Sequence, residues 1–390
     1  MKNIRQKTKA VRAGQARTPE REHSDPIFAT SSFVFTSAEH AAELFAENEI
    51  GNIYSRFTNP TNRAFESRLA ALEGAKYCSS TASGMSAILT ICMSVLQSGD
   101  QIAATRGMFG STVNLFRNIL SRFGITTSFY SPSEICSAKL DSATRMIFIE
   151  SPSNPLCEIV DISQLAQVRD SLPNCILVVD NSACTPFLQL PLSLGANVVV
   201  YSSTKFIEGQ GRVVGGAVVT DDEDIANAVN GFLRTAGPSM SPFNAWISLK
   251  GLETLSVRMK ESCSNAREIA QWLQNHPKVD GVYYPGLKQH SGHELAARQQ
   301  SDFGALLAFE VHGGTDEAWK LIDSVSIFSV TGNLGDVKST ITHPASTTHL
   351  RIQESDRKRM GISDGLIRLS IGLEDVQDLI EDLQSALDSI

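Results

Sequence analysis

The feature that most constrains the fold is a repeated alternation of short apolar segments with helix-like segments between residues 65 and 205. The apolar segments predict strands at 77–83, 102–105, 145–150, 175–180 and 198–205. Helical spacing predicts helices at 65–74, from 84 onward, at 111–123 and at 161–172. Strands that are apolar throughout and separated by helices form mostly parallel sheets covered on both faces. We therefore expect an α/β fold.

The length of the chain predicts more than one domain, because 390 residues exceed the size at which a single core stops growing. Residues 1–60 are rich in turn-prone pieces, which predicts an irregular arm that packs on another subunit. The alternating pattern ends near residue 260. Short strands at 282–284, 305–309 and 367–371 then predict a smaller α+β domain. The expected division is an arm at 1–60, a large domain at 61–260 and a C-terminal domain at 261–390.

Charge and composition exclude several classes of partner. A net charge of −8 argues against nucleic acid and anionic membranes. No apolar stretch has the length of a membrane span, and the basic N-terminus lacks the apolar segment of a secretory signal. The seven cysteines form no C-x-x-C pair and no cluster with histidine. We therefore expect reduced cysteines, no metal site and a cytoplasmic protein.

Polar residues gather where the predicted strands end. Glu150, Asn154, Asp180 and Lys205 all lie at such ends, and ligands of parallel sheets bind along the carboxyl edge. A lysine after the apolar run that begins at Val198 would have a lowered pKa if it were enclosed, and its amine could then act as a nucleophile. Taken alone, this stretch is equally compatible with a lysine that extends into solvent.

Two further residues specify the chemistry. Asp180 ends an apolar strand and needs a cationic or protonated partner. Gly84 follows a strand and opens a helix, a layout that presents backbone N–H groups to an anion, although many such turns hold no phosphate. An aldehyde for Lys205, an aromatic nitrogen for Asp180 and a phosphate for Gly84 are the groups of pyridoxal phosphate. The sequence thus predicts this cofactor, with Lys205 as its Schiff-base lysine.

Two other readings are less favoured. Ser202-x-x-Lys205 matches the nucleophile motif of β-lactamase-like acyl enzymes, but there the serine opens a helix and Lys-Thr-Gly follows downstream. Here a strand precedes the serine and the chain has no Lys-Thr-Gly. A nucleotide-binding or purely structural α/β protein is the other possibility. The chain lacks both the phosphate-binding loop G-x-x-x-x-G-K-[ST] and a G-x-G-x-x-G after a strand.

The stretch 202–210 resembles the lysine signature of the Cys/Met-metabolism family of pyridoxal-phosphate enzymes. This family includes cystathionine γ-synthase, cystathionine lyases, methionine γ-lyase and homoserine sulfhydrylases. Further ordered blocks of resemblance, which together span nearly the whole chain, are 54–56, 83–85, 150–155, 179–181, 251–255, 342–345 and 368–372. Segments 235–239, 242–246 and 333–336 resemble the sulfhydrylases that act on O-succinylhomoserine. The resemblance implies the fold-type I, aspartate-aminotransferase-like architecture of pyridoxal-phosphate transferases.

The resemblance also implies roles for single residues. Lys205 would carry the cofactor and shuttle protons, and Asp180 would pair with the pyridine nitrogen. Arg368 would bind the substrate carboxylate through its guanidinium, a bidentate task that suits arginine. The residues that would hold the phosphate are Gly84, Met85, Ser202 and Thr204, together with Tyr54 and Arg56 from the neighbouring subunit. Asn154 would lie near the ring hydroxyl, and the main chain at Asn333 and Leu334 near the substrate carboxylate.

One departure from the family bears on the reaction. The residue that stacks on the cofactor is usually tyrosine, but Phe109 stands there and cannot transfer a proton. This argues against a lyase. The resemblance implies γ-replacement on O-succinylhomoserine with sulfide to give homocysteine for methionine biosynthesis, with cysteine as the alternative thiol and a γ-lyase less favoured. It also implies a homotetramer of catalytic dimers. His343 is expected to be a structural loop histidine.

Overall fold

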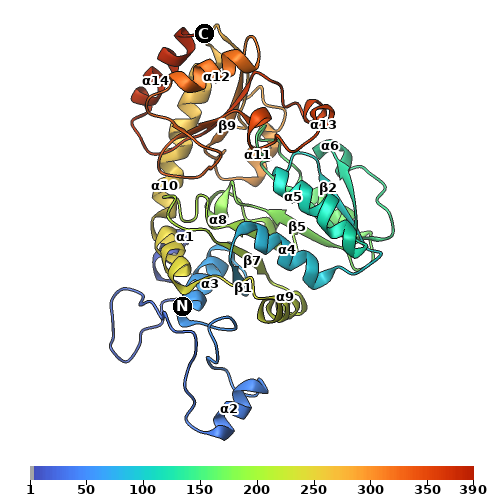
Figure 1. Ribbon diagram of the computed structural model, residues 1–390, viewed down its shortest axis with the longest axis vertical. Coiled ribbons are helices and arrows are strands. Elements are labelled where there is room, and N and C mark those ends of the chain that lie inside the picture. The colour runs from blue at the N-terminus through green and yellow to red at the C-terminus, as the bar shows by residue number, and fades with distance from the viewer. Residues whose placement is uncertain (1–3) are drawn as a thin grey trace.

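The computed structural model describes residues 4–390, and its larger domain is built on a seven-stranded sheet in the order β1-β7-β6-β5-β4-β2-β3 (Figure 1). The five strands from β6 to β3 in that order run parallel, and β7 is antiparallel to both β6 and β1. This confirms the predicted α/β fold with a mostly parallel sheet. The strands are β1 Tyr77–Thr81, β2 Gln101–Thr105, β3 Thr126–Tyr130, β4 Thr144–Glu150, β5 Ile176–Asp180, β6 Val198–Ser202 and β7 Gly216–Thr220.

Helices cover both faces of this sheet because its central strands are apolar on both sides. Val178 and Val200 pack in the same core cluster as helices α4 and α9, whereas Leu177 and Val179 pack on the opposite face beneath α7. Helices α3 and α10 cover the β1–β7–β6 part of that second face. These helices are α3 Pro60–Glu73, α4 Gly84–Val95, α7 Ile162–Asp170, α9 Glu223–Ala236 and α10 Pro242–Gln274.

Several details of the large domain differ from the sequence-based prediction. Strands β3 and β7 were not predicted; β3 is a half-exposed edge strand without an apolar run, and β7 follows directly on a glycine-rich stretch. The helix expected at 111–123 is irregular. It starts as α5 Gly110–Asn114, widens into a π-helical turn at Leu115–Ile119 and tightens into a 3₁₀ turn at Leu120–Phe123. Helical periodicity alone does not distinguish these turn types.

The smaller domain holds a five-stranded sheet in the order β10-β11-β12-β9-β8. Its strands are β8 Val279–Tyr283, β9 Leu306–Val311, β10 Ser329–Val330, β11 Thr340–Thr342 and β12 Leu366–Ser370, and helices α12 Thr315–Ser324 and α14 Val376–Asp388 pack together over it. Helix α10, 33 residues long, runs from the large sheet into this domain (Figure 1). The boundary expected near residue 260 therefore lies inside a continuous helix.

The N-terminal segment has two unpredicted short helices. Helix α1 Gln6–Arg12 packs on α3 and α10 of the same chain, where Ala10 is buried. Beyond it the chain extends away from the large domain and carries α2 Ala38–Phe45 at its far end (Figure 1). Val34 and Ile50 in this extension are 98% and 96% exposed. Among residues 4–390, no helix combines the length and the apolar character needed to cross a bilayer.

Candidate active site

The carboxyl ends of β4, β5 and β6 open onto a cavity at the base of the small domain. In the sheet register Glu150 lies opposite Asp180, so two acidic side chains end neighbouring strands. Eight of the predicted site residues line this cavity: Gly84, Met85, Phe109, Asn154, Asp180, Ser202, Lys205 and Leu334. Glu150, Ser182, Ala183, Ile88, Thr112, Leu306 and Gly332 complete the lining.

Lys205 lies in the turn after β6, with its ammonium end inside the cavity. Its Nζ donates a hydrogen bond to Oδ1 of Asn333 at 2.6 Å, which brings a residue of the small domain to the lysine. Burial, and after it the positive charge of Arg368, lowers the pKa of Lys205 from 10.5 to about 8, although Asp180 and Glu150 act in the opposite direction. A sizeable fraction of the amine is therefore unprotonated near neutral pH, as a nucleophile requires.

The two carboxylates have the opposite shift. Burial raises the pKa of Asp180, which is held down in part by the Ser182 N–H group that it accepts at 3.0 Å. Burial and the neighbouring Asp180 raise the pKa of Glu150, which accepts the Phe109 N–H group at 3.0 Å. Asp180 is thus a half-buried carboxylate that faces the same cavity as Lys205, a position in which it can pair with a protonated ring nitrogen.

The N-terminus of α4 provides an anion seat. Ser83 caps the helix by accepting the Ser86 N–H group, and within residues 4–390 the N–H groups of Gly84 and Met85 have no hydrogen-bond partner. A Cβ at Gly84 would lie 2.7 Å from Cβ of Ser202, so only glycine lets the two segments meet. Free N–H groups at the positive end of a helix of 12 residues suit a phosphate.

Thr204, also predicted to hold the phosphate, is not part of the cavity lining, and its hydroxyl is bonded to Gly215. Its hydroxyl donates to the carbonyl of Gly215 at 3.2 Å and accepts the N–H group of the same residue at 3.0 Å. One lone pair remains, so the hydroxyl could accept but not donate a further hydrogen bond in this arrangement. The hydroxyl of Ser202, in contrast, has no hydrogen-bond partner within the described residues and lines the cavity.

Arg368, on β12, is fully buried and lies at the side of the cavity toward the small domain. Its Nη2 donates to the carbonyl oxygens of Asn333 (2.7 Å) and Gly332 (3.2 Å), and its Nη1 to Oδ1 of Asn154 (3.4 Å). Its Nε is buried and has no partner within residues 4–390. Burial lowers the pKa of Arg368 to about 10, so the group is still a cation near neutrality. A buried cationic donor with an unused N–H group suits a substrate carboxylate.

Tyr54 and Arg56 are not brought to Lys205 within the chain. Arg56 lines a second cavity, between the N-terminal extension and the large domain. The Arg56 guanidinium lies over the rings of Tyr54 and Phe57, at 5.7 and 4.9 Å from their centroids. Their expected contact with the phosphate of a neighbouring subunit stays a prediction.

Sequence reasoning gave no role to two residues that stand out here. Glu150 was noted at a strand end, yet its pairing with Asp180 depends on the sheet register. Ser182 was not singled out, although its position two residues after a strand-ending aspartate is a usable signal. His343 lies outside the cavity lining, with Nδ1 near Oγ of Ser346 (2.8 Å) and Nε2 near the carbonyl of Asp364 (2.9 Å), which agrees with a structural histidine.

The sheet, the lysine, the aspartate and the anion seat together fit a pyridoxal-phosphate enzyme. The family model described as "Cys/Met metabolism PLP-dependent enzyme" matches residues 7–388, and the chain belongs to this family. The family assignment confirms the prediction from the sequence and, with it, pyridoxal phosphate as the cofactor.

Two relatives within this family are similar to the chain over nearly its whole length. The chain is 52% identical over 382 residues, covering 97% of this chain and 94% of the other, to O-succinylhomoserine sulfhydrylase of Pseudomonas aeruginosa. It is 39% identical over 387 residues, covering 98% of both chains, to L-methionine γ-lyase of Fusobacterium nucleatum.

Two solved structures superimpose on nearly the whole fold. One is a putative O-acetylhomoserine (thiol)-lyase of Campylobacter jejuni with pyridoxyl-lysine phosphate, with a TM-score of 0.95, 33% identity and coverage of 99% of this chain and 100% of that chain. The other is cystathionine γ-synthase of Xanthomonas oryzae in complex with aminoacrylate and cysteine, with a TM-score of 0.94, 36% identity and coverage of 99% and 98%.

Proposed function

We propose that the chain catalyses γ-replacement on O-succinylhomoserine with sulfide and so makes homocysteine and succinate for methionine biosynthesis. In this reaction the bond between Cγ and the succinyl oxygen breaks, and a bond between Cγ and sulfur forms. The observation that carries the proposal is the buried Arg368, whose guanidinium donates to Asn154 and Gly332 of the cavity lining and keeps an Nε–H group without a partner among residues 4–390. The 52% identity to an O-succinylhomoserine sulfhydrylase supports this choice of substrate.

The chain's own residues would divide the work as follows. Arg368 binds the carboxylate of the amino acid and thereby fixes the α-carbon beside Lys205. The unprotonated Lys205 amine takes the α-proton and later returns a proton, a task that suits its pKa of about 8. Asp180 keeps the ring nitrogen protonated, and the N–H groups of Gly84 and Met85 hold the phosphate. The bound cofactor supplies an electron sink for the charge created by proton removal.

Phe109 favours replacement over elimination. Its ring lines the cavity, where the family usually has tyrosine, and its side chain carries no proton to give to a leaving group. An activated ester needs less help to leave than a thiolate, because succinate is a weaker base. A γ-lyase, like the relative from Fusobacterium nucleatum, is therefore the less favoured reading.

A direct assay separates the candidates. Purified protein would be given O-succinylhomoserine or O-acetylhomoserine, each with sulfide or with cysteine, and homocysteine and cystathionine would be measured by mass spectrometry. We expect the succinyl ester with sulfide to give the highest kcat/KM. Faster formation of cystathionine from cysteine would make the chain a cystathionine γ-synthase, like the relative from Xanthomonas oryzae. Release of a keto acid without any thiol would show a lyase.

We further infer catalytic dimers that pair into a homotetramer in the cytoplasm. Arg56 and Lys205 line different cavities of the same chain, which supports a site completed by Arg56 of a second subunit. Exposed Val34 and Ile50 on the N-terminal extension support a large contact with another chain. All seven cysteines are free, which suits a reducing compartment. Light scattering after size-exclusion chromatography would give the mass of the assembly.

A further inference from the structure

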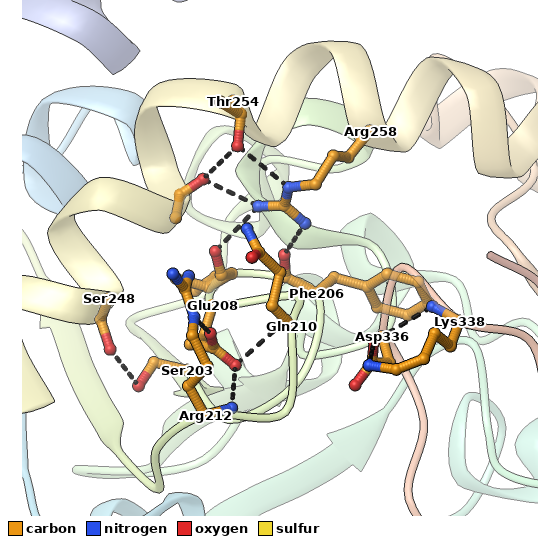
Figure 2. A network of polar contacts seen from close by, with 12 residues as sticks. Ser203, Phe206, Glu208, Gln210, Arg212, Ser248, Thr254, Arg258, Asp336 and Lys338 are labelled. Carbon is orange, nitrogen blue, oxygen red and sulfur yellow. Dashed lines mark hydrogen bonds and ion pairs between the residues drawn. The ribbon is translucent and has the colours of Figure 1, made fainter. Parts of the chain in front are cut away.

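The turn that follows Lys205 is held from outside the cavity by one arginine of α10 (Figure 2). Arg258 donates from Nη1 to the carbonyl of Phe206 at 2.7 Å and from Nη2 to the carbonyl of Ile207 at 3.0 Å. Its remaining bonds anchor it to its own helix, at the carbonyl of Gly251 (2.8 Å) and Oγ1 of Thr254 (3.1 Å). Arg258 is only 7% exposed, so these bonds form away from water.

Glycines allow the turn and the helix to touch. A Cβ at Gly209, where φ is +71°, would lie 2.0 Å from Nη1 of Arg258. A Cβ at Gly251 would lie 2.3 Å from the carbonyl oxygen of Ile207. The fully buried Glu208 closes the turn by accepting the N–H groups of Gln210 (3.1 Å) and Arg212 (3.0 Å), and it forms an ion pair with the Arg212 guanidinium (Figure 2).

The opposite side of the turn is closed by the loop that carries Asn333. A Cβ at Gly335 would lie 2.5 Å from the nitrogen of Phe206 and 2.9 Å from the carbonyl carbon of Lys205. The N–H group of Gly209 donates to the Lys205 carbonyl, and the N–H group of Val337 donates to the Gly209 carbonyl, both at 2.8 Å. The backbone of Lys205 is thus confined between α10 and the loop whose Asn333 binds its Nζ.

We propose that Arg258 is a positioning residue for Lys205, which acts by fixing the two carbonyl groups that follow the lysine. It does not line the cavity, so it acts through the turn and not on the substrate. Because α10 continues into the small domain, Arg258 also links that domain to the lysine. The proposal rests on the proposed role of Lys205 as the reacting lysine. Losing Arg258 should change the environment of the lysine while leaving substrate affinity nearly unchanged.

The test compares Arg258→Lys with Asn265→Ala in the holoenzyme. A lysine keeps the charge but cannot span two carbonyl groups, a helix carbonyl and a hydroxyl at once. Asn265 is a matched control, since it is a buried residue of α10 that donates to two carbonyls, those of Gly372 (3.4 Å) and Glu374 (3.0 Å), away from the lysine turn. The first readout is the pH midpoint of the visible absorption band of the bound cofactor, which needs no turnover.

For Arg258→Lys we expect a midpoint shifted by about half a pH unit or more, and kcat reduced about tenfold with KM within about twofold. Asn265→Ala should show neither change at a comparable loss of thermal stability. In Arg258→Ala, added guanidinium should restore part of the activity. Thr254→Val removes the Nε partner of Arg258 together with a long bond from the Thr254 hydroxyl to the Gly251 carbonyl, and leaves the two bonds to the turn in place. It should show a smaller shift in the same direction and serves if the Arg258 variants do not fold.

An unchanged midpoint and kcat in folded Arg258→Lys, or an equal shift in Asn265→Ala, would overturn the proposal. If neither Arg258 variant folds, an unchanged pH midpoint of the visible band in Thr254→Val would overturn the proposal. Failure of the proposed function would look different. The wild-type protein would then show the visible band and its midpoint, yet it would turn over no homoserine ester.

Discussion

The charge of Arg368 should control how much Lys205 amine is free to react. The pKa of Lys205 falls from 10.5 to about 8, first through burial and then through Arg368. This drop corresponds to about 3 kcal/mol of differential stabilisation of the neutral amine. At pH 7.5 a pKa of 8 leaves roughly a quarter of the amine unprotonated, against roughly one part in a thousand for a pKa of 10.5.

Arg368→Met removes the positive charge that lowers the pKa of Lys205 but leaves the lysine buried. The pKa of Lys205 should therefore rise but stay below 10.5, and a rise of about half to one unit would reduce the free amine about three- to tenfold. The assay is the pH dependence of Lys205 modification in the apoenzyme by an amine-selective reagent, quantified by peptide mass spectrometry. Arg298→Met is the control, because it removes an exposed guanidinium paired with Asp161.

The lowered pKa of Lys205 also determines how this residue's contribution to folding stability changes with pH. Its folded pKa lies below the unfolded value, so between about pH 8 and 10.5 the unfolded chain holds the proton and the folded chain does not. The Lys205 contribution to apoenzyme stability therefore increases with pH across this window and is absent below it. In the modification assay, a Lys205 midpoint near pH 10.5 in the wild-type apoenzyme would contradict the reasoning. A midpoint in Arg368→Met at or below the wild-type value would also contradict it.

Four more outcomes follow from the site. Lys205→Ala should abolish both turnover and the visible band of covalently held cofactor, measured by kinetics and absorbance. Asp180→Asn should lower kcat about 100-fold or more while the melting temperature changes little, since a buried carboxylate is costly to hold. Gly84→Val should weaken cofactor binding about tenfold or more in equilibrium titrations, because its Cβ would lie 2.7 Å from Cβ of Ser202. Mixed Arg56→Ala and Lys205→Ala subunits, each inactive alone, should regain about a quarter of wild-type activity if sites are shared between subunits; a mixture without activity would count against sharing.

The core of the fold could be predicted because its strands are buried on both faces. The apolar runs that end at Glu150 and Asp180 have no polar alternation and are separated by helical segments, which few folds other than a parallel sheet accommodate. Strand β3 was not predicted because an edge strand needs no continuous apolar run. The irregular turns at 115–123 were not predicted because hydrophobic periodicity does not distinguish the i+3, i+4 and i+5 hydrogen bonds of 3₁₀, α and π turns.

The strand-end residues of the site could also be predicted, since a parallel sheet brings its carboxyl ends to one edge. The alternation of strands and helices does not predict contacts between distant segments of the chain. Asn333 reaches Lys205 across 128 residues of sequence. Arg258 lies in helix α10, which was not predicted, and no local pattern in the sequence indicates its contact with the lysine turn.

Two sets of unused donors define what the site can hold. The N–H groups of Gly84 and Met85 lie at the N-terminus of α4 in the large domain, and the Nε of Arg368 lies on β12 of the small domain. Lys205 lies between the two domains, bonded to Asn333, whose carbonyl in turn binds Arg368. One anionic group must therefore meet each domain, while a carbonyl or amine meets the lysine. A phosphorylated aldehyde together with an α-amino acid satisfies all three positions, whereas a single monoanionic ligand would leave one domain's donors unpaired.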